Sequence, residues 1–229
     1  MFRSLPLALL LLFFSATSAR AQQQDAQLWE QLNVVVPVAP RLHLTVEQIA
    51  RISDRQGGLY TTEFGGLLGW QVAKGVEIGF GYRHVGFYNG NTAPDEERLR
   101  QQVVLTSGRF AGRLRLDERF NPRGSEIGFR IRPLLRYNLP LGPEQVALFV
   151  SHESFILPNS TSWGQRAGYE RMRNILGVAF PIAKAVKADV GYLNQYRLAR
   201  GGAQAQMDHA LNIQVTVNLG ALGVAGLHD

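Results

Sequence analysis

The chain has 229 residues, of which 45% are hydrophobic and 18% charged, with 24 lysines and arginines against 18 aspartates and glutamates. This composition is typical of a folded protein, and it excludes both global disorder and a bundle of membrane-spanning helices. Cysteine is absent, which excludes disulfides, thiolate metal sites, a cysteine nucleophile and a lipid-modified cysteine.

The N-terminal segment 1–21 has the features of a secretory signal peptide. Arg3 supplies the positive start, residues 5–14 form an apolar run, and residues 19–21 place small side chains where a signal peptidase reads them. The run is too short for a transmembrane helix, which needs about 20 apolar residues. We therefore predict cleavage before Gln22, export from the cytoplasm, and a mature net charge of 22 − 18 = +4.

Beyond the signal segment, apolar and polar residues alternate with a period of two, which is the pattern of β-strands. The clearest runs lie at residues 42–47, 76–83, 110–120, 126–137 and 209–219. Tight turns are predicted near 38–40, 73–75, 107–108, 141–143 and 181–184, and longer connections at 53–58, 88–96, 121–125, 157–168 and 200–208. Short and long connections thus alternate. Because no linker interrupts the pattern, we predict a single domain at 22–229.

Two β architectures produce this alternation. A soluble sandwich or ligand-binding barrel buries its apolar face, whereas a transmembrane barrel turns that face to lipid and its polar face to the lumen. The runs at 75–88 and 126–140 are longer than ordinary strands of about 5 to 6 residues, and they are long enough to cross a bilayer. Aromatic residues near the ends of the runs fit an interfacial girdle: Trp29, Tyr60, Trp70, Phe87, Tyr88, Phe120, Tyr137, Phe155, Tyr192 and Tyr196. The sequence therefore favours the transmembrane barrel.

Such a barrel must close, because no backbone N–H or C=O group can be left unpaired in lipid. The chain has eleven alternating runs, whereas bacterial single-chain barrels have an even number of strands. We therefore predict an all-β, antiparallel, up-and-down transmembrane β-barrel of about 12 strands, within a range of 10–12. The last strand is expected at about 208–219, followed by a short tail at 220–229.

Segments along the whole mature chain resemble those of one bacterial family. In order they are Leu28-Trp29-Glu30-Gln31-Leu32, residues 76–83, residues 113–120, the arginine-rich residues 129–137, Glu153-Ser154-Phe155, residues 171–177 and residues 210–213. Together they are similar to the uncharacterised family catalogued as domain of unknown function 2490. The resemblance implies an outer-membrane-type barrel and brings no activity or ligand. One departure is Leu219, where outer-membrane barrels commonly end their last strand with an aromatic residue.

The polar faces of the runs carry many arginines interleaved with carboxylates. We predict that they form a charge network in the lumen, made of Arg83, Arg113, Arg115, Asp117, Arg119, Glu126, Arg130, Arg132, Arg136, Glu153, Arg171 and Arg173. Ion pairs among them would hold the strands together. We expect these charges to face inward, because a charge on the lipid face costs about 2–4 kcal/mol at the bilayer midplane. Alternatively, surplus arginines line a path for anions, because guanidinium groups bind carboxylate and phosphate in a bidentate manner.

Metal and cofactor motifs are absent from the sequence. The five histidines, His43, His84, His152, His209 and His228, lack HExxH or any paired metal-ligand spacing. The GxSxG, Walker and GxGxxG patterns are missing as well. We therefore predict neither a metal site nor a cofactor.

One catalytic arrangement stands out, the His152-Glu153-Ser154 segment. On a strand, His152 and Ser154 share a face, which is the lipid side if Val150 faces lipid. Outer-membrane phospholipases and deacylases are similar in placing His-x-Ser on the lipid face. They have Asn directly after the Ser, whereas this chain has Phe155, and either Asn174 or Gln165 could orient the histidine.

The sequence predicts a bacterial outer-membrane protein with a structural or channel-like role, which passes or binds small anionic solutes. Its expected partners are outer-membrane lipid, the barrel-assembly machinery and such a solute. Nucleic acid is not expected, because the basic residues are spread along the strands rather than clustered. Two alternatives stay open: a lipid hydrolase that uses His152 and Ser154, and a soluble periplasmic ligand-binding barrel. Of these classes, the sequence favours a protein that is not an enzyme.

Overall fold

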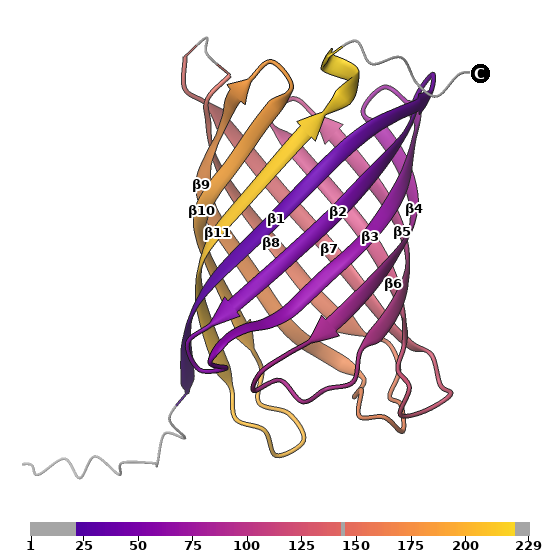
Figure 1. Cartoon of the computed structure of the whole chain (residues 1–229), viewed down its shortest axis with the longest axis vertical. Coiled ribbons are helices and arrows are strands. Elements are labelled where there is room, and N and C mark those ends of the chain that lie inside the picture. Colours follow the sequence, from indigo (N-terminus) through magenta and orange to yellow (C-terminus); the bar gives the residue numbers. More distant parts are fainter. Residues whose placement is uncertain (1–21, 143–144, 223–229) are drawn as a thin grey trace, which may run out of the picture.

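The computed structural model describes residues 22–142 and 145–222, and these residues form eleven strands that close into one barrel (Figure 1). The strands are β1 (Gln23–Ala39), β2 (Leu42–Ser53), β3 (Gly58–Ala73), β4 (Val76–Phe87), β5 (Glu96–Ser107), β6 (Phe110–Phe120), β7 (Gly128–Pro140), β8 (Ala147–Leu157), β9 (Gly168–Ala183), β10 (Val186–Arg197) and β11 (Gln206–Asn218). A short 3₁₀ helix, η1 (Leu219–Leu222), follows β11 and contacts β1. Among the described residues, no helix is long and apolar enough to cross a membrane. The predicted all-β barrel is confirmed, while the expected signal peptide at 1–21 lies outside the described residues.

The barrel closes through a parallel pair of strands. Ten neighbouring pairs are antiparallel, but β1 and β11 run in the same direction, with Leu28 opposite Leu211. Eleven strands lie within the predicted range of 10–12 but are one fewer than the preferred 12, and the prediction that all strands pair antiparallel is wrong. In an up-and-down barrel, an odd number of strands makes the first and last strands parallel. The hydrogen bonds between β1 and β11 leave neither strand as an open edge, so the barrel is closed. The last strand ends at Asn218, one residue before the predicted end.

Short turns and long loops lie at opposite ends of the barrel, as Figure 1 shows. The two-residue turn between β3 and β4 depends on Gly75, which has a φ of 73°. A Cβ at Gly75 would lie 2.3 Å from the carbonyl oxygen of Thr106, so only glycine fits there. The long loops connect β4–β5, β6–β7, β8–β9 and β10–β11, and the shorter β2–β3 connection, residues 54–57, lies at the same end. Because the strand number is odd, β1 begins at the long-loop end and β11 ends at the short-turn end.

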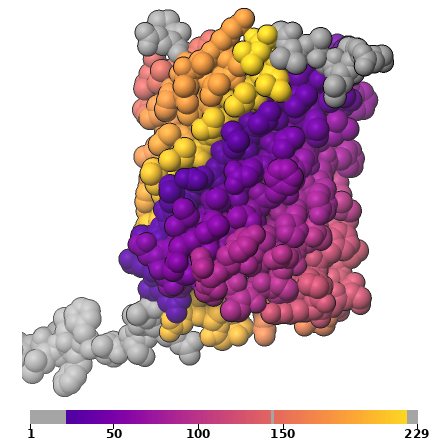
Figure 2. All heavy atoms as spheres, in the orientation of Figure 1, coloured from indigo at the N-terminus to yellow at the C-terminus, as the bar shows by residue number. Residues whose placement is uncertain are grey.

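The two faces of the wall have opposite character. On β6, Leu114 points outward and is 56% exposed, whereas Asp117 points inward and is completely buried. Similarly exposed apolar side chains cover the outside of other strands, for example Phe64, Phe80 and Leu176 at 60–62%. Successive side chains of a strand point to opposite faces, so the alternation in the sequence sorts them in this way. The strands pack side by side as a continuous wall on the face seen in Figure 2.

The aromatic residues near strand ends divide between the two faces. Trp70 and Tyr192 point outward, and each is 52% exposed. Trp29, Tyr60 and Phe155 lie inside the barrel, at most 6% exposed, so the prediction that they belong to an outer girdle is wrong. The rings of Trp29 and Phe155 lie against arginine guanidinium groups, which the faces of aromatic rings attract.

Candidate functional site

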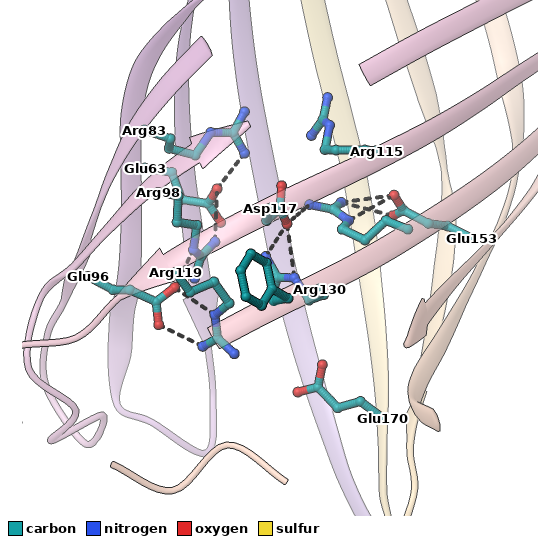
Figure 3. Close-up of polar contacts among 12 residues, drawn as sticks. Glu63, Arg83, Glu96, Arg98, Arg115, Asp117, Arg119, Arg130, Glu153 and Glu170 are labelled. Atoms are coloured by element: carbon teal, nitrogen blue, oxygen red, sulfur yellow. Dashed lines mark hydrogen bonds and ion pairs between the residues drawn. The ribbon is translucent and has the colours of Figure 1, made fainter. Parts of the chain in front are cut away.

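Asp117 of β6 is fully buried inside the lumen, where it forms the first cluster of ion pairs. The Asp117 carboxylate accepts hydrogen bonds from Arg130 Nη2 at 2.6 Å and from Arg132 Nη1 at 3.3 Å (Figure 3). Both arginines come from β7, whose residues pair with β6, so the ion pairs join neighbouring strands across the inner face. Charge-assisted hydrogen bonds of this kind are stronger than neutral ones.

A second cluster surrounds Glu153 of β8, which is 3% exposed. Its carboxylate contacts Arg113 of β6 at 2.5 Å, Arg132 of β7 at 2.9 Å and Arg173 of β9 at 3.3 Å. Four strands therefore meet at one carboxylate. Phe155, two residues further along β8, presents its ring 4.6 Å from Arg132 and 5.0 Å from Arg173.

The opposite wall of the lumen carries Glu47 of β2 and Glu63 of β3. Arg83 of β4 bridges them, with Nη2 2.7 Å from Glu47 and Nη1 2.5 Å from Glu63. Arg100 of β5 adds a contact of 2.5 Å to Glu47, and Arg51 adds one of 2.7 Å to Glu63. The two carboxylates thus connect β2, β3, β4 and β5 from the inside.

At the long-loop end, Arg119 of β6 joins Glu96 of β5 to the β8–β9 loop. Arg119 donates to Glu96 at 2.6 Å and to Gln165 of the β8–β9 loop at 2.8 Å. In the same loop, the ring of Trp163 lies 5.2 Å from the Arg119 guanidinium. Gly128 makes room for this ring, because a Cβ there would lie 2.5 Å from it. The loop is therefore folded into the mouth of the barrel.

Eleven of the twelve residues predicted for the lumen network point into the barrel. Glu126 does not: it lies in the β6–β7 loop and accepts a hydrogen bond from the Ser162 backbone. Hydrogen bonds from the Ser162 side chain and backbone also lower the pKa of Glu126. The prediction for Glu126 is wrong because the predicted run begins at residue 126, whereas β7 begins two residues later, at Gly128.

The lumen also contains charges that the predicted network does not include, chiefly the buried Glu96, Arg98 and Arg100 of β5 and Asp208 of β11, and the half-buried Glu170 of β9. The signal for β5 was available, because Glu96, Arg98, Arg100 and Gln102 alternate with Leu99 and Val103. Glu170 could not be found in this way, because a bulge in β9 changes the face to which it points.

A cavity of about 220 Å³ lies inside the barrel toward the long loops. Its lining includes eight arginines and one carboxylate, Glu63; the arginines are Arg51, Arg98, Arg119, Arg130, Arg132, Arg171, Arg173 and Arg197. Within the described residues, the buried Nε atoms of Arg51, Arg171, Arg173 and Arg197 have no hydrogen-bond partner. These atoms have almost no accessible surface, and the Arg197 Nε lies 3.5 Å from Asp208 Oδ2, so a solute in the cavity would meet other atoms of the arginines.

The outer face carries a separate polar cluster at the segment that the sequence singled out. His152 Nδ1 lies 2.7 Å from Asn174 Oδ1, and His152 Nε2 lies 3.0 Å from Ser154 Oγ. Pairing of β8 with β9 places Asn174 directly opposite His152. Of the two orienting residues considered, the structure brings Asn174 to the histidine. Gln165 is buried in the mouth of the barrel, where it bonds Arg119.

Tyr169 completes this cluster, which we call the outer-face cluster (His152, Ser154, Tyr169 and Asn174). Its hydroxyl lies 2.9 Å from Ser154 Oγ. Tyr169 reaches the outside because β9 has a bulge: Phe155 pairs with Arg171, but Ile156 pairs with Tyr169, so Glu170 is the extra residue. The bulge turns Glu170 inward and Tyr169 outward, whereas regular alternation would do the reverse.

Metal-ligating side chains do not gather elsewhere in the barrel. Across residues 22–142 and 145–222, no group of three or more His, Asp or Glu side chains is placed to hold a metal ion.

These features define a closed β-barrel with an apolar outer wall and an ion-paired interior. The chain belongs to the family described as "Protein of unknown function (DUF2490)", whose model matches residues 26–206, and the predicted resemblance is confirmed. It is 30% identical over 238 residues to an uncharacterized protein of Methylorubrum extorquens, an alignment that covers 95% of this chain and 99% of that protein. A solved structure from work on the in-meso crystallization of membrane proteins is 12% identical, with a TM-score of 0.41, and covers 79% of this chain and 86% of that one. A likeness of this size is too weak to show a shared fold.

Proposed function

We propose that the protein is a bacterial outer-membrane β-barrel that spans the bilayer with its lumen closed by ion pairs. The observation that supports this proposal is the inverted sidedness of the wall. Phe64, Phe80 and Leu176 are about 60% exposed on the outside, whereas Arg100, Glu96 and Asp117 are at most 1% exposed on the inside. A water-soluble barrel needs the opposite arrangement, because exposed apolar surface is unfavourable in water.

Closure of the lumen makes a structural role the first expectation for this barrel. Side chains of all four strands β6 to β9 meet at Glu153, and the cavity above it, toward the short turns, measures only about 150 Å³. An open pore of this strand number would have to displace these ion pairs, and each buried carboxylate would then leave arginines unpaired.

The test is membrane fractionation followed by recording in planar bilayers. We expect the protein in the outer-membrane fraction, with a folded form that migrates differently from the heated form in detergent gels. In bilayers we expect no steady conductance from the wild-type protein. Recovery of the folded protein as a detergent-free, water-soluble monomer would overturn the membrane location, whereas a stable open channel would overturn only the closed lumen.

Binding of a small anion is the second function that we propose, and the arginine-lined cavity supports it. Eight arginines and one carboxylate, Glu63, line this cavity, so its wall presents mostly guanidinium groups. Guanidinium groups bind carboxylate and phosphate by paired hydrogen bonds, so an anion of about the size of phosphate fits both the charge and the volume.

We expect inorganic phosphate to stabilise the folded protein at constant ionic strength. A ligand that binds only the native state adds about 2.7 kcal/mol at 100 times its Kd. Arg197→Gln, which removes a cavity arginine that is 36% exposed, should weaken this gain. Arg136→Gln is the matched control, since Arg136 pairs with Asp189 away from the cavity. Equal stabilisation of both variants in urea unfolding would contradict binding in this cavity.

A further inference from the structure

We propose that the outer-face cluster is a hydrolytic site for acyl esters of membrane lipids. In this site Ser154 is the nucleophile, His152 the general base and acid, Asn174 the positioning residue and Tyr169 the oxyanion donor. The lipid substrate rests on the outer-membrane location proposed above, whereas the chemistry of the cluster rests on its own geometry.

The two hydrogen bonds of His152 determine its tautomer. Asn174 Oδ1 can only accept, so the proton of the neutral ring must be on Nδ1, 2.7 Å away. Nε2 then carries the free lone pair, and it lies 3.0 Å from Ser154 Oγ, within reach of the hydroxyl proton. A nucleophile, a base and a group that orients the base are the three parts that activate a serine.

Tyr169 supplies the fourth part. Its hydroxyl is 2.9 Å from Ser154 Oγ, the same atom that His152 Nε2 contacts at 3.0 Å. When Ser154 accepts the acyl group, the negative charge develops on an oxygen one bond from the attacked carbon, and the phenol can donate to it. The β-bulge at Glu170 is what places Tyr169 there, and bulges often aim side chains at active sites.

The surroundings indicate a lipid substrate. Leu135 pairs with His152 from β7 and is 56% exposed, and Val150 and Leu176 on the same outer face are 50% and 62% exposed. The polar cluster is therefore surrounded by apolar side chains on which an acyl chain can lie. Ser154 is three residues from the long-loop end of β8, about 10 Å of strand. In the membrane location proposed above, this position lies nearer the headgroups than the midplane, on the side where the ester groups of lipids lie.

The reaction is an ordinary ester hydrolysis. Ser154 Oγ attacks the ester carbonyl carbon while its proton passes to His152 Nε2. The bond from the carbonyl carbon to the alcohol oxygen then breaks, and His152 returns the proton to that oxygen. Water next attacks the acyl-serine and gives a proton to His152, which passes it to Ser154 Oγ as the fatty acid leaves. The co-reactant is water from the adjacent interface.

The experiment uses the full mature chain, folded in detergent, and measures two quantities. The first is covalent labelling of Ser154 by a long-chain fluorophosphonate, which reports an activated serine without knowledge of the substrate. The second is fatty-acid release, from phosphatidylethanolamine micelles in one arm and from lipopolysaccharide in the other. We expect both labelling and fatty-acid release in the wild type. In Ser154→Ala and His152→Phe the rate of release should fall by about 10³-fold or more.

Matched variants separate catalysis from folding. Thr62 and Tyr88 form a similar outward hydroxyl–phenol pair at 3.2 Å, so Thr62→Ala is the control for Ser154→Ala. Asn194 pairs with Asn174 across the strands but bonds Met207, so Asn194→Ala is the control for Asn174→Ala. Asn174→Ala should lower kcat about 10²-fold at unchanged KM, and Asn174→Asp should restore it. Tyr169→Phe should lower kcat about 10²-fold.

Each outcome bears on one proposal. Release from only one lipid source identifies the ester that is cleaved. A folded, heat-modifiable wild type without labelling and without release from either source overturns the hydrolase, and so does labelling without release. If the chain is soluble without detergent but labels at Ser154, the membrane location fails while the activated serine stands.

Discussion

Glu153→Gln is expected to lower the free energy of unfolding by about 3–5 kcal/mol, which is the cost of removing one partner from a buried ion pair. Glu153 is 3% exposed and faces three arginines, Arg113, Arg132 and Arg173, at 2.5–3.3 Å. Glutamine keeps the shape but not the charge, so these arginines keep their positive charges without the carboxylate that neutralises them. Urea-induced unfolding of the protein in phospholipid vesicles measures the effect.

Glu118→Gln is the control, because Glu118 points outward on β6 and accepts a hydrogen bond from the neutral Gln101. Its removal should change stability by no more than about 0.5 kcal/mol. A second variant tests the cause: combining Glu153→Gln with Arg113→Met removes one of the unpaired charges and should recover part of the loss. Equal stability of Glu153→Gln and the wild type would mean that water enters the lumen and that the interior is not sealed.

The sidedness of the barrel could be predicted from the sequence, because alternation alone decides which residues share a face. The strand number could not be predicted from alternation alone. The chain has eleven alternating runs, and only the pairing of β1 with β11 shows that these eleven are sufficient. The rule of even numbers applies to barrels whose first and last strands are antiparallel, whereas here Gln23 to Val35 pair in parallel with Gln206 to Asn218.

The outer-face cluster was only half visible in the sequence. His152 and Ser154 are separated by one residue, so their common face follows from strand geometry. Asn174 is 22 residues away from His152, and its position depends on the register of β8 against β9. Tyr169 depends further on the bulge at Glu170, which reverses the alternation at that point. Register and bulges arise from the pairing of whole strands, and local patterns do not encode them.

Leu114→Arg is expected to lower the stability of the membrane-inserted barrel by about 2–4 kcal/mol, because an arginine at the bilayer midplane faces hydrocarbon. Leu114 lies in the middle of β6, is 56% exposed on the outer face, and has Val103 and Pro133 as its cross-strand neighbours. In a water-soluble barrel the same exposed position would accept arginine at a cost within about 0.5 kcal/mol. Unfolding by urea in vesicles of defined thickness gives the difference from the wild type.

Leu105→Arg is the control that separates the effect of depth in the membrane from the effect of introducing an arginine at any exposed position. Leu105 is 55% exposed, almost the same as Leu114, but it lies two residues from the short-turn end of β5. An arginine near the interface can reach the headgroups, so its cost should fall to about 0–1 kcal/mol. A dependence on depth at equal exposure is what hydrocarbon produces and water does not. If the two variants lose the same free energy, the outer wall does not lie in a bilayer.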